Sequence, residues 1–292
     1  MSNTSTPPGS AIQPLIDILT LEKVEVNLFR GVTPPDERGR FRIYGGQVIA
    51  QALMAAYQTI DGRVCHSLQS YFIRPGDPKA PVLYEVERSR EGKSFATRRV
   101  IAIQHGEQIF NMAASFQTPE HGFDHQAPIP AAPTPETIPT DQERASADPN
   151  LPAALKEFLA RDYAIEFRRA DPIDPLHPQK SEPRQQVWFR AAGEVGEDLA
   201  LNQAVLAYAT DMSLLGTCAR PHGVSWMTGV QMASLDHILW FHRPSRISDW
   251  HLYDQDSPSA SGARGFNRGS IFTADGVLIA SVAQEGLLRP IR

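Results

Sequence analysis

The chain has 292 residues, a formal net charge of −5 at pH 7, 41% hydrophobic residues and 21% charged residues. This composition is typical of a globular protein with a substantial core, and the length suits two average domains or one large one. The acidic balance argues against a dedicated nucleic-acid binder, and no apolar run approaches the ~20 residues that span a bilayer. We therefore expect no nucleic-acid partner and no membrane span.

The two cysteines, Cys65 and Cys218, lie far apart and show no metal-binding spacing. This usage indicates a reducing compartment and no disulfide framework. The N-terminal segment lacks the basic start and apolar core of a signal peptide. We therefore expect a cytoplasmic protein.

Residues 1–13 are expected to be disordered, and residues 14–118 are expected to form strands around one helix. The helix is predicted over residues 45–58, where GGQVIAQALMAAYQ is apolar nearly all round and must be enclosed by other structure. Four strands are predicted after it, in VCHSLQSYFIR, VLYEVER, SFATRRVIAIQ and QIFNMAASF. Residues 119–150 are rich in Pro and Ala, which predicts a linker without helix or central strand.

Residues 151–292 repeat this plan. A second apolar helix is predicted over residues 198–215, in DLALNQAVLAYATDMSLL, followed by strands in SLDHILWFHR, WHLYDQD, ARGFNRGSIFT and VLIASVAQ. Each unit then consists of an antiparallel sheet curled around a buried helix. The sequence therefore predicts an α+β fold that is made twice.

Short matches between the two units support a duplication. SYFIRP matches LWFHRP through Arg74 and Arg243, and two later hairpin segments match through Gly106 and Gly276 at nearly the same separation. The units differ where Gln284 aligns with Ala114 and where Ser234 aligns with Cys65. Asp211 is a third difference, because the matching part of the first helix carries no carboxylate.

Each of the three polar residues also has a purely structural interpretation. Gln284 could be a solvent-facing strand end, Ser234 could bond to nearby backbone, and Asp211 could mark where the helix meets water. On one face of a strand, Gln284 would share its side with Leu278, Ala280 and Val282. The occurrence of all three differences in the second unit favours a functional site.

Several segments resemble the acyl-CoA thioesterase II family, from about Leu21 to Arg289. They include GGQVIAQAL, HSLQSYFIRPGD, GKSFATRRV, FNMAASFQ, SLDHILWFHRP, SASGARGF and DGVLIASVAQEGLLR. The resemblance implies a double hot-dog fold, an acyl-CoA substrate, no cofactor, and assembly into a homodimer or homotetramer. It further implies that Asp211, Ser234 and Gln284 hold the water that attacks the thioester, and that the site of the first unit is vestigial. Ser234 stands where bacterial members often carry Thr.

Other kinds of site match less well. A serine nucleophile elbow needs G-x-S-x-G, and HGVSWMTG around Ser225 has Met in place of the second Gly. His237 and His242 are expected on opposite strand faces, so that they could not share a metal ion, and no HExxH occurs.

A hot-dog hydratase or dehydratase pairs an Asp with a His, and no His is expected beside Asp211. A non-catalytic acyl-CoA binding module is the remaining alternative. The backbone N–H groups of Gly45 and Gly46 are one suggestion for oxyanion donors.

Overall fold

The computed structural model describes residues 11–34, 42–161 and 163–291. The helices are α1 (Gln13–Leu19), α2 (Gly45–Tyr57), α3 (Asp141–Ala147), α4 (Ala153–Leu159) and α5 (Leu199–Thr210), with 3₁₀ turns η1 (Pro135–Thr137) and η2 (Leu214–His222). The strands of the first half are β1 (Glu22–Glu25), β2 (Leu28–Gly31), β3 (Val64–Phe72), β4 (Val82–Glu91), β5 (Phe95–Gln104) and β6 (Glu107–Gln117). Those of the second half are β7 (Ile165–Arg169), β8 (Arg184–Ala191), β9 (Val230–Ser234), β10 (Asp236–Phe241), β11 (His251–Ser261), β12 (Arg264–Thr273) and β13 (Leu278–Pro290).

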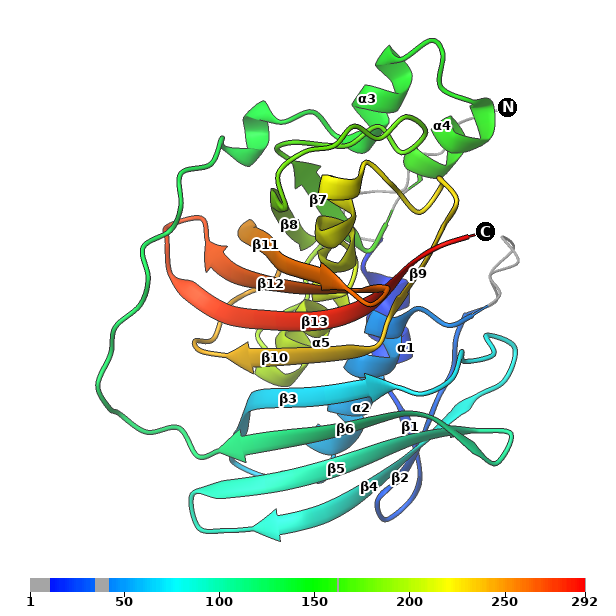
Figure 1. Ribbon diagram of the computed structural model, residues 1–292. Helices are drawn as coiled ribbons and strands as arrows, with labels where there is room; N and C mark the ends of the chain where they lie inside the picture. Colours follow the sequence, from blue (N-terminus) through cyan, green and yellow to red (C-terminus); the bar gives the residue numbers. More distant parts are fainter. Residues whose placement is uncertain (1–10, 35–41, 162, 292) are drawn as a thin grey trace.

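The described strands form one antiparallel sheet, in the order β1-β2-β4-β5-β6-β3-β10-β13-β12-β11-β8-β7, with β9 paired to β13. The two halves meet at the centre, where Leu68 of β3 lies opposite Leu239 of β10. The order β4-β5-β6-β3 on one side of this seam corresponds to β11-β12-β13-β10 on the other (Figure 1). Helices α2 and α5 contact each other and lie against the same side of the sheet.

Helix α2 buries most of its side chains, among them the two amides Gln47 and Gln51. Gln51 is fully buried. Its Nε2 donates to the Ile18 carbonyl at 2.7 Å, and its Oε1 accepts from the Tyr84 hydroxyl at 2.7 Å. Buried polar groups are tolerated when they are hydrogen-bonded in this way. Gln51 therefore ties α2 to the N-terminal helix and to β4, whereas Gln47 donates to Thr33, in the segment after β2.

The eight strands predicted from the sequence all occur, with shifts at their ends. Two changes concern the second half: the segment SLDHILWFHR is divided between β9 and β10, and β13 runs on to Pro290. The second helix was predicted to reach residue 215, but α5 ends at Thr210. The chain leaves the helix at Asp211 and continues through a turn into η2. Because the helix ends early, the Asp211 carboxylate lies at the C-terminal end of α5 instead of on its side.

The predicted linker passes the ends of the central strands on its way from β6 towards α3, as the green trace in Figure 1 shows. The expectation that it contains no helix is wrong, because η1 and α3 lie within residues 119–150. Thr140 starts α3 with a capping box, in which its hydroxyl accepts from the Glu143 N–H and the Glu143 carboxylate accepts from the Thr140 N–H. This capping box directly follows Pro139 and starts a helix inside the Pro- and Ala-rich segment.

At the N-terminus, residues 1–10 of the expected disordered stretch lie outside the described residues. Ile12 is 1% exposed and α1 begins at Gln13, so the boundary drawn at residue 13 falls inside ordered structure. Throughout the described ranges, no helix has both the length and the apolar character needed to cross a membrane.

Candidate active site

Asp211 lies at the C-terminal end of α5, where the helix meets the sheet. The preceding helix is apolar and buried along almost its whole length, and the Asp211 side chain is only 4% exposed. A carboxylate in such a place needs hydrogen-bond donors, because burial without partners strongly disfavours its charge.

Ser234 and Gln284 supply those donors. The Ser234 hydroxyl donates to Asp211 Oδ1 at 2.9 Å, and Gln284 Nε2 donates to the same oxygen at 2.6 Å. Ser234 ends β9, which pairs with β13 so that Ser234 lies opposite Gly286, two residues beyond Gln284. The structure thus brings together the three residues singled out in the sequence, from a helix end and two neighbouring strands.

Gln284 is not a solvent-facing strand end. It is fully buried in the middle of β13, on the face that also buries Ala280 and Val282. Leu278 stands apart from this face because the pairing with β12 is irregular between Leu278 and Ala280. Both hydrogens of the Gln284 amide nitrogen have acceptors, whereas its Oε1 is buried and has no hydrogen-bond partner among the described residues.

The first half contributes the N-terminal end of α2. Gly46 bonds through its backbone N–H to the Asp211 carboxyl. A Cβ at Gly45 would lie 2.7 Å from Asp211 Oδ2 and 2.9 Å from the Phe72 ring, so only glycine allows this approach. Helix N-termini favour negative charge. The Gly46 N–H, suggested above as an oxyanion donor, is therefore engaged with the carboxylate.

Burial and hydrogen bonding act on Asp211 in opposite directions. Burial raises its pKa to about 6, while the hydrogen bonds from Gln284, Ser234 and Gly46 and the positive charge of Arg42 limit the rise. The carboxyl group therefore changes its charge close to neutral pH. That is the range in which a general base works best in a cell.

One residue of the site was missed from the sequence. The expectation that Asp211 has no histidine beside it is wrong, because His237 Nδ1 lies 3.9 Å from Asp211 Oδ1. His237 is fully buried, and burial lowers its pKa to about 3, so the ring is neutral. The sequence carried a signal for it: alternation along β10 turns His237 inward and leaves its neighbour Asp236 and the later His242 more exposed.

The other candidates are structural. The Ser225 hydroxyl donates to the Pro175 carbonyl and accepts from the Met227 N–H, which fixes the loop between η2 and β9. It shows no strand-to-helix elbow of the serine hydrolase type. Within the part of the chain that the structure describes, no three His, Cys, Asp or Glu side chains are grouped so as to hold a metal ion.

Comparison with known proteins identifies the family of the chain. A protein-family model described as acyl-CoA thioesterase N-terminal domain matches residues 33–117, and a second family model, described as acyl-CoA thioesterase, matches residues 155–287. Acyl-coenzyme A thioesterase 8 of Homo sapiens is 42% identical over 297 residues, covering 97% of this chain and 91% of the human protein. The crystal structure of the acyl-CoA thioesterase II TesB2 from Mycobacterium marinum is 41% identical, with a TM-score of 0.76, and the match covers 96% and 98% of the two chains. The chain belongs to the acyl-CoA thioesterase II family.

The same fold is also found in more distant proteins. A protein of unknown function with a hot-dog fold from Alicyclobacillus acidocaldarius superimposes with a TM-score of 0.74 at 18% identity, covering 94% of this chain and 98% of that one. At this identity the likeness concerns the fold alone. The chain has an α+β hot-dog fold, as the sequence predicts.

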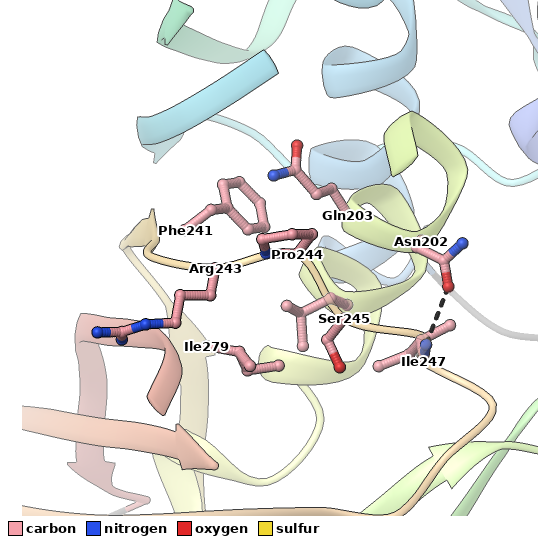
Figure 2. Close-up of a pocket in the computed structure, with 9 residues that line it drawn as sticks. Asn202, Gln203, Phe241, Arg243, Pro244, Ser245, Ile247 and Ile279 are labelled. Atoms are coloured by element: carbon pink, nitrogen blue, oxygen red, sulfur yellow. Dashed lines mark hydrogen bonds between the residues drawn. The ribbon is translucent and has the colours of Figure 1, made fainter. Parts of the chain in front are cut away.

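A small pocket lies at the N-terminal end of α5, whereas Asp211 lies at its C-terminal end. Figure 2 shows Gln203, from the first turns of the helix, on the side of Phe241 and Pro244, while Asn202 Oδ1 accepts from the Ile247 N–H. It encloses about 10 Å³, which is room for about one water molecule. None of the three predicted site residues lines it.

Proposed function

We propose that this protein hydrolyses acyl-CoA to a free fatty acid and coenzyme A, with a water activated by Asp211, Ser234 and Gln284 and without a covalent intermediate. The observation that carries the proposal is the buried Asp211 carboxylate, whose Oδ1 accepts from both Ser234 and Gln284. Membership of the acyl-CoA thioesterase II family supports the same reaction class.

The arrangement offers two hydrogen-bond acceptors to one water molecule. The Asp211 carboxylate is one acceptor, and the unpartnered Oε1 of Gln284 is the other. A water that donates both hydrogens to these oxygens turns a lone pair outward, towards an incoming thioester. Such positioning lowers the entropic part of the barrier.

In the proposed step, the water oxygen forms a bond to the thioester carbonyl carbon while one water proton passes to Asp211. The carbonyl oxygen becomes an oxyanion in the tetrahedral intermediate. That intermediate then collapses, the C–S bond breaks, and the coenzyme A thiolate leaves and takes up the proton that Asp211 had accepted. Because Asp211 has a pKa near 6, it is mostly ionised at neutral pH and can still release the proton again.

One observation favours a different reaction of the same fold. The 3.9 Å approach of His237 to Asp211 resembles the Asp and His pair of a hot-dog hydratase or dehydratase. Both ring nitrogens of His237 are hydrogen-bonded within the protein, one to Gln284 and one to Thr210. The ring therefore has no nitrogen left to exchange a proton with a substrate, and hydrolysis is the better proposal.

We also propose that the chain is a double hot dog whose first-half site is vestigial. The matching strand orders on the two sides of the seam support two fused repeats. At the counterpart of the active site, the Tyr57 hydroxyl bonds to Gln203 and to the Cys65 N–H, so a tyrosine occupies the C-terminal end of α2. The pocket of Figure 2 borders this cluster through Gln203.

The test is to incubate the purified protein with acyl-CoA esters of different length and branching and to follow the release of free thiol. Release that is lost in Asp211→Asn supports the proposal. Hydration of an enoyl-CoA without thiol release would favour the hydratase, and binding without turnover would favour a non-catalytic module. Sedimentation of the same sample checks the expected homodimer or homotetramer.

A further inference from the structure

We propose that His237, held by Thr210, is a positioning residue that fixes which way the Gln284 amide points. This inference rests on the proposed function, because the amide matters there as the acceptor for the attacking water. His237 would touch neither water nor substrate and would act only through Gln284.

The hydrogen bonds form a chain with one direction. The Thr210 hydroxyl donates to the Ala207 carbonyl at 3.0 Å, so it can only accept at its 2.9 Å contact with His237 Nε2. His237 therefore carries its proton on Nε2 and offers the lone pair of Nδ1. Gln284 Nε2 lies 3.1 Å from this Nδ1 and donates to it.

This chain excludes the reversed amide. If the Gln284 amide were turned over, its oxygen would face two acceptors, the Asp211 carboxylate oxygen and the His237 Nδ1. Inside a protein such contacts between acceptors are costly, because no water screens them. With the nitrogen held on both sides, Oε1 stays available as an acceptor, which is the role the proposed mechanism gives it.

The first half shows what the same position looks like without a site. The pairing of β10 with β13 places Ile238 opposite Ala283, and the next pair in this register is His237 opposite Gln284. The matching pair of β3 and β6 is Leu68 opposite Ala114. A fully buried imidazole thus occurs where the facing residue is an amide, and a leucine where it is an alanine.

The first experiment compares His237→Leu, which copies Leu68, with His251→Leu as a matched control. His251 is also fully buried, its Nε2 lies 2.6 Å from the Ser245 hydroxyl, and its ring contacts Phe189 instead of the carboxylate site. We expect His237→Leu to lower kcat for acyl-CoA hydrolysis tenfold or more with KM within about twofold, since an unfixed amide misplaces the water. The control should lose thermal stability with kcat within about twofold of wild type. A folded His237→Leu protein with wild-type kcat would overturn the inference.

Thr210 provides a second, milder test if His237→Leu does not fold. Thr210→Ser keeps the hydroxyl and should retain most of kcat, whereas Thr210→Val keeps the shape, removes the acceptor and should lower kcat. Equal kcat in the two folded variants would contradict the proposed chain.

The protonation state of His237 gives a readout that does not depend on turnover. ¹⁵N chemical shifts of the histidine ring in the wild-type protein should show the neutral form with the proton on Nε2 at pH 7. A proton on Nδ1, or a charged ring, would overturn the inference even if the enzyme is active. If the wild-type protein cleaves no thioester, the proposed function fails, and the ring tautomer still decides whether His237 orients the amide.

Discussion

Gln284 donates a 2.6 Å hydrogen bond to the carboxylate of Asp211, a residue 73 positions earlier in the chain. The bond joins the middle of a central strand to the end of a central helix, and both groups are buried. It orients the amide and at the same time stabilises the charge on Asp211. Geometry and acidity at this site therefore depend on the same contact.

Replacing Gln284 by alanine, the residue at the matching position of the first half, tests both effects. We expect Gln284→Ala to lower kcat by about 10²-fold, the scale of one misplaced reacting group. The hydrogen bond from Gln284 lowers the Asp211 pKa, so its removal should raise that pKa further. The acidic limb of the pH–rate profile should then move to higher pH. Full activity with an unchanged profile would leave Gln284 a structural residue.

Asp211→Asn removes the charge and keeps the shape. General-base catalysis contributes about 10²- to 10⁴-fold, so we expect kcat to fall in this range while KM changes little. In the wild-type protein kcat should decline as the pH falls through about 6, the pKa of Asp211, because the base becomes protonated. Steady-state rates between pH 5 and 8 check both expectations. A flat profile over this range would argue against Asp211 as the base.

Much of this site could be predicted because the chain contains a comparison with itself. Gln284 and Ser234 stood out against Ala114 and Cys65 of the first half, and Asp211 stood out in an apolar helix. The eight strands followed from alternation and hairpin turns. Segments without such a reference, among them the short edge strands β1 and β7, were not predicted.

His237 shows why the rest could not be predicted. The alternation of β10 places the side chain inward, but its distance from Asp211 depends on where α5 ends. The apolar pattern runs on past Asp211, and only the three-dimensional structure shows the helix ending at Thr210. Likewise, nothing in the spacing of Gly45 and Asp211 indicates that the N-terminus of α2 lies against the carboxylate, since that contact depends on how α2 and α5 pack.

Gly45 provides a test of that contact. A methyl group there would lie 2.7 Å from Asp211 Oδ2 and 2.9 Å from the Phe72 ring, so Gly45→Ala should displace the carboxylate. We expect kcat to fall tenfold or more, with a loss of stability of about 1–3 kcal/mol from overpacking. Gly122→Ala is the control, because a Cβ at that exposed position meets no atom within 4 Å. Equal activity of the two variants would show that the approach of α2 to Asp211 is not required.

The raised pKa of Asp211 also has a consequence for stability. Burial raises the pKa from 3.8 to about 6 in the folded protein, so the folded state binds the proton more tightly than the unfolded state does. The contribution to stability is therefore fully present below about pH 4 and is lost as the pH rises through about 6. Asp211→Asn, which is neutral at every pH, should have a larger free energy of unfolding than wild type at pH 8, by an amount on the order of 1–3 kcal/mol, and should therefore unfold at a higher temperature. The advantage should shrink towards pH 4. Thermal unfolding of both proteins across this pH range measures the difference in stability. A variant less stable than wild type at pH 8 would mean that the hydrogen bonds to the charged carboxylate outweigh the cost of burying that charge.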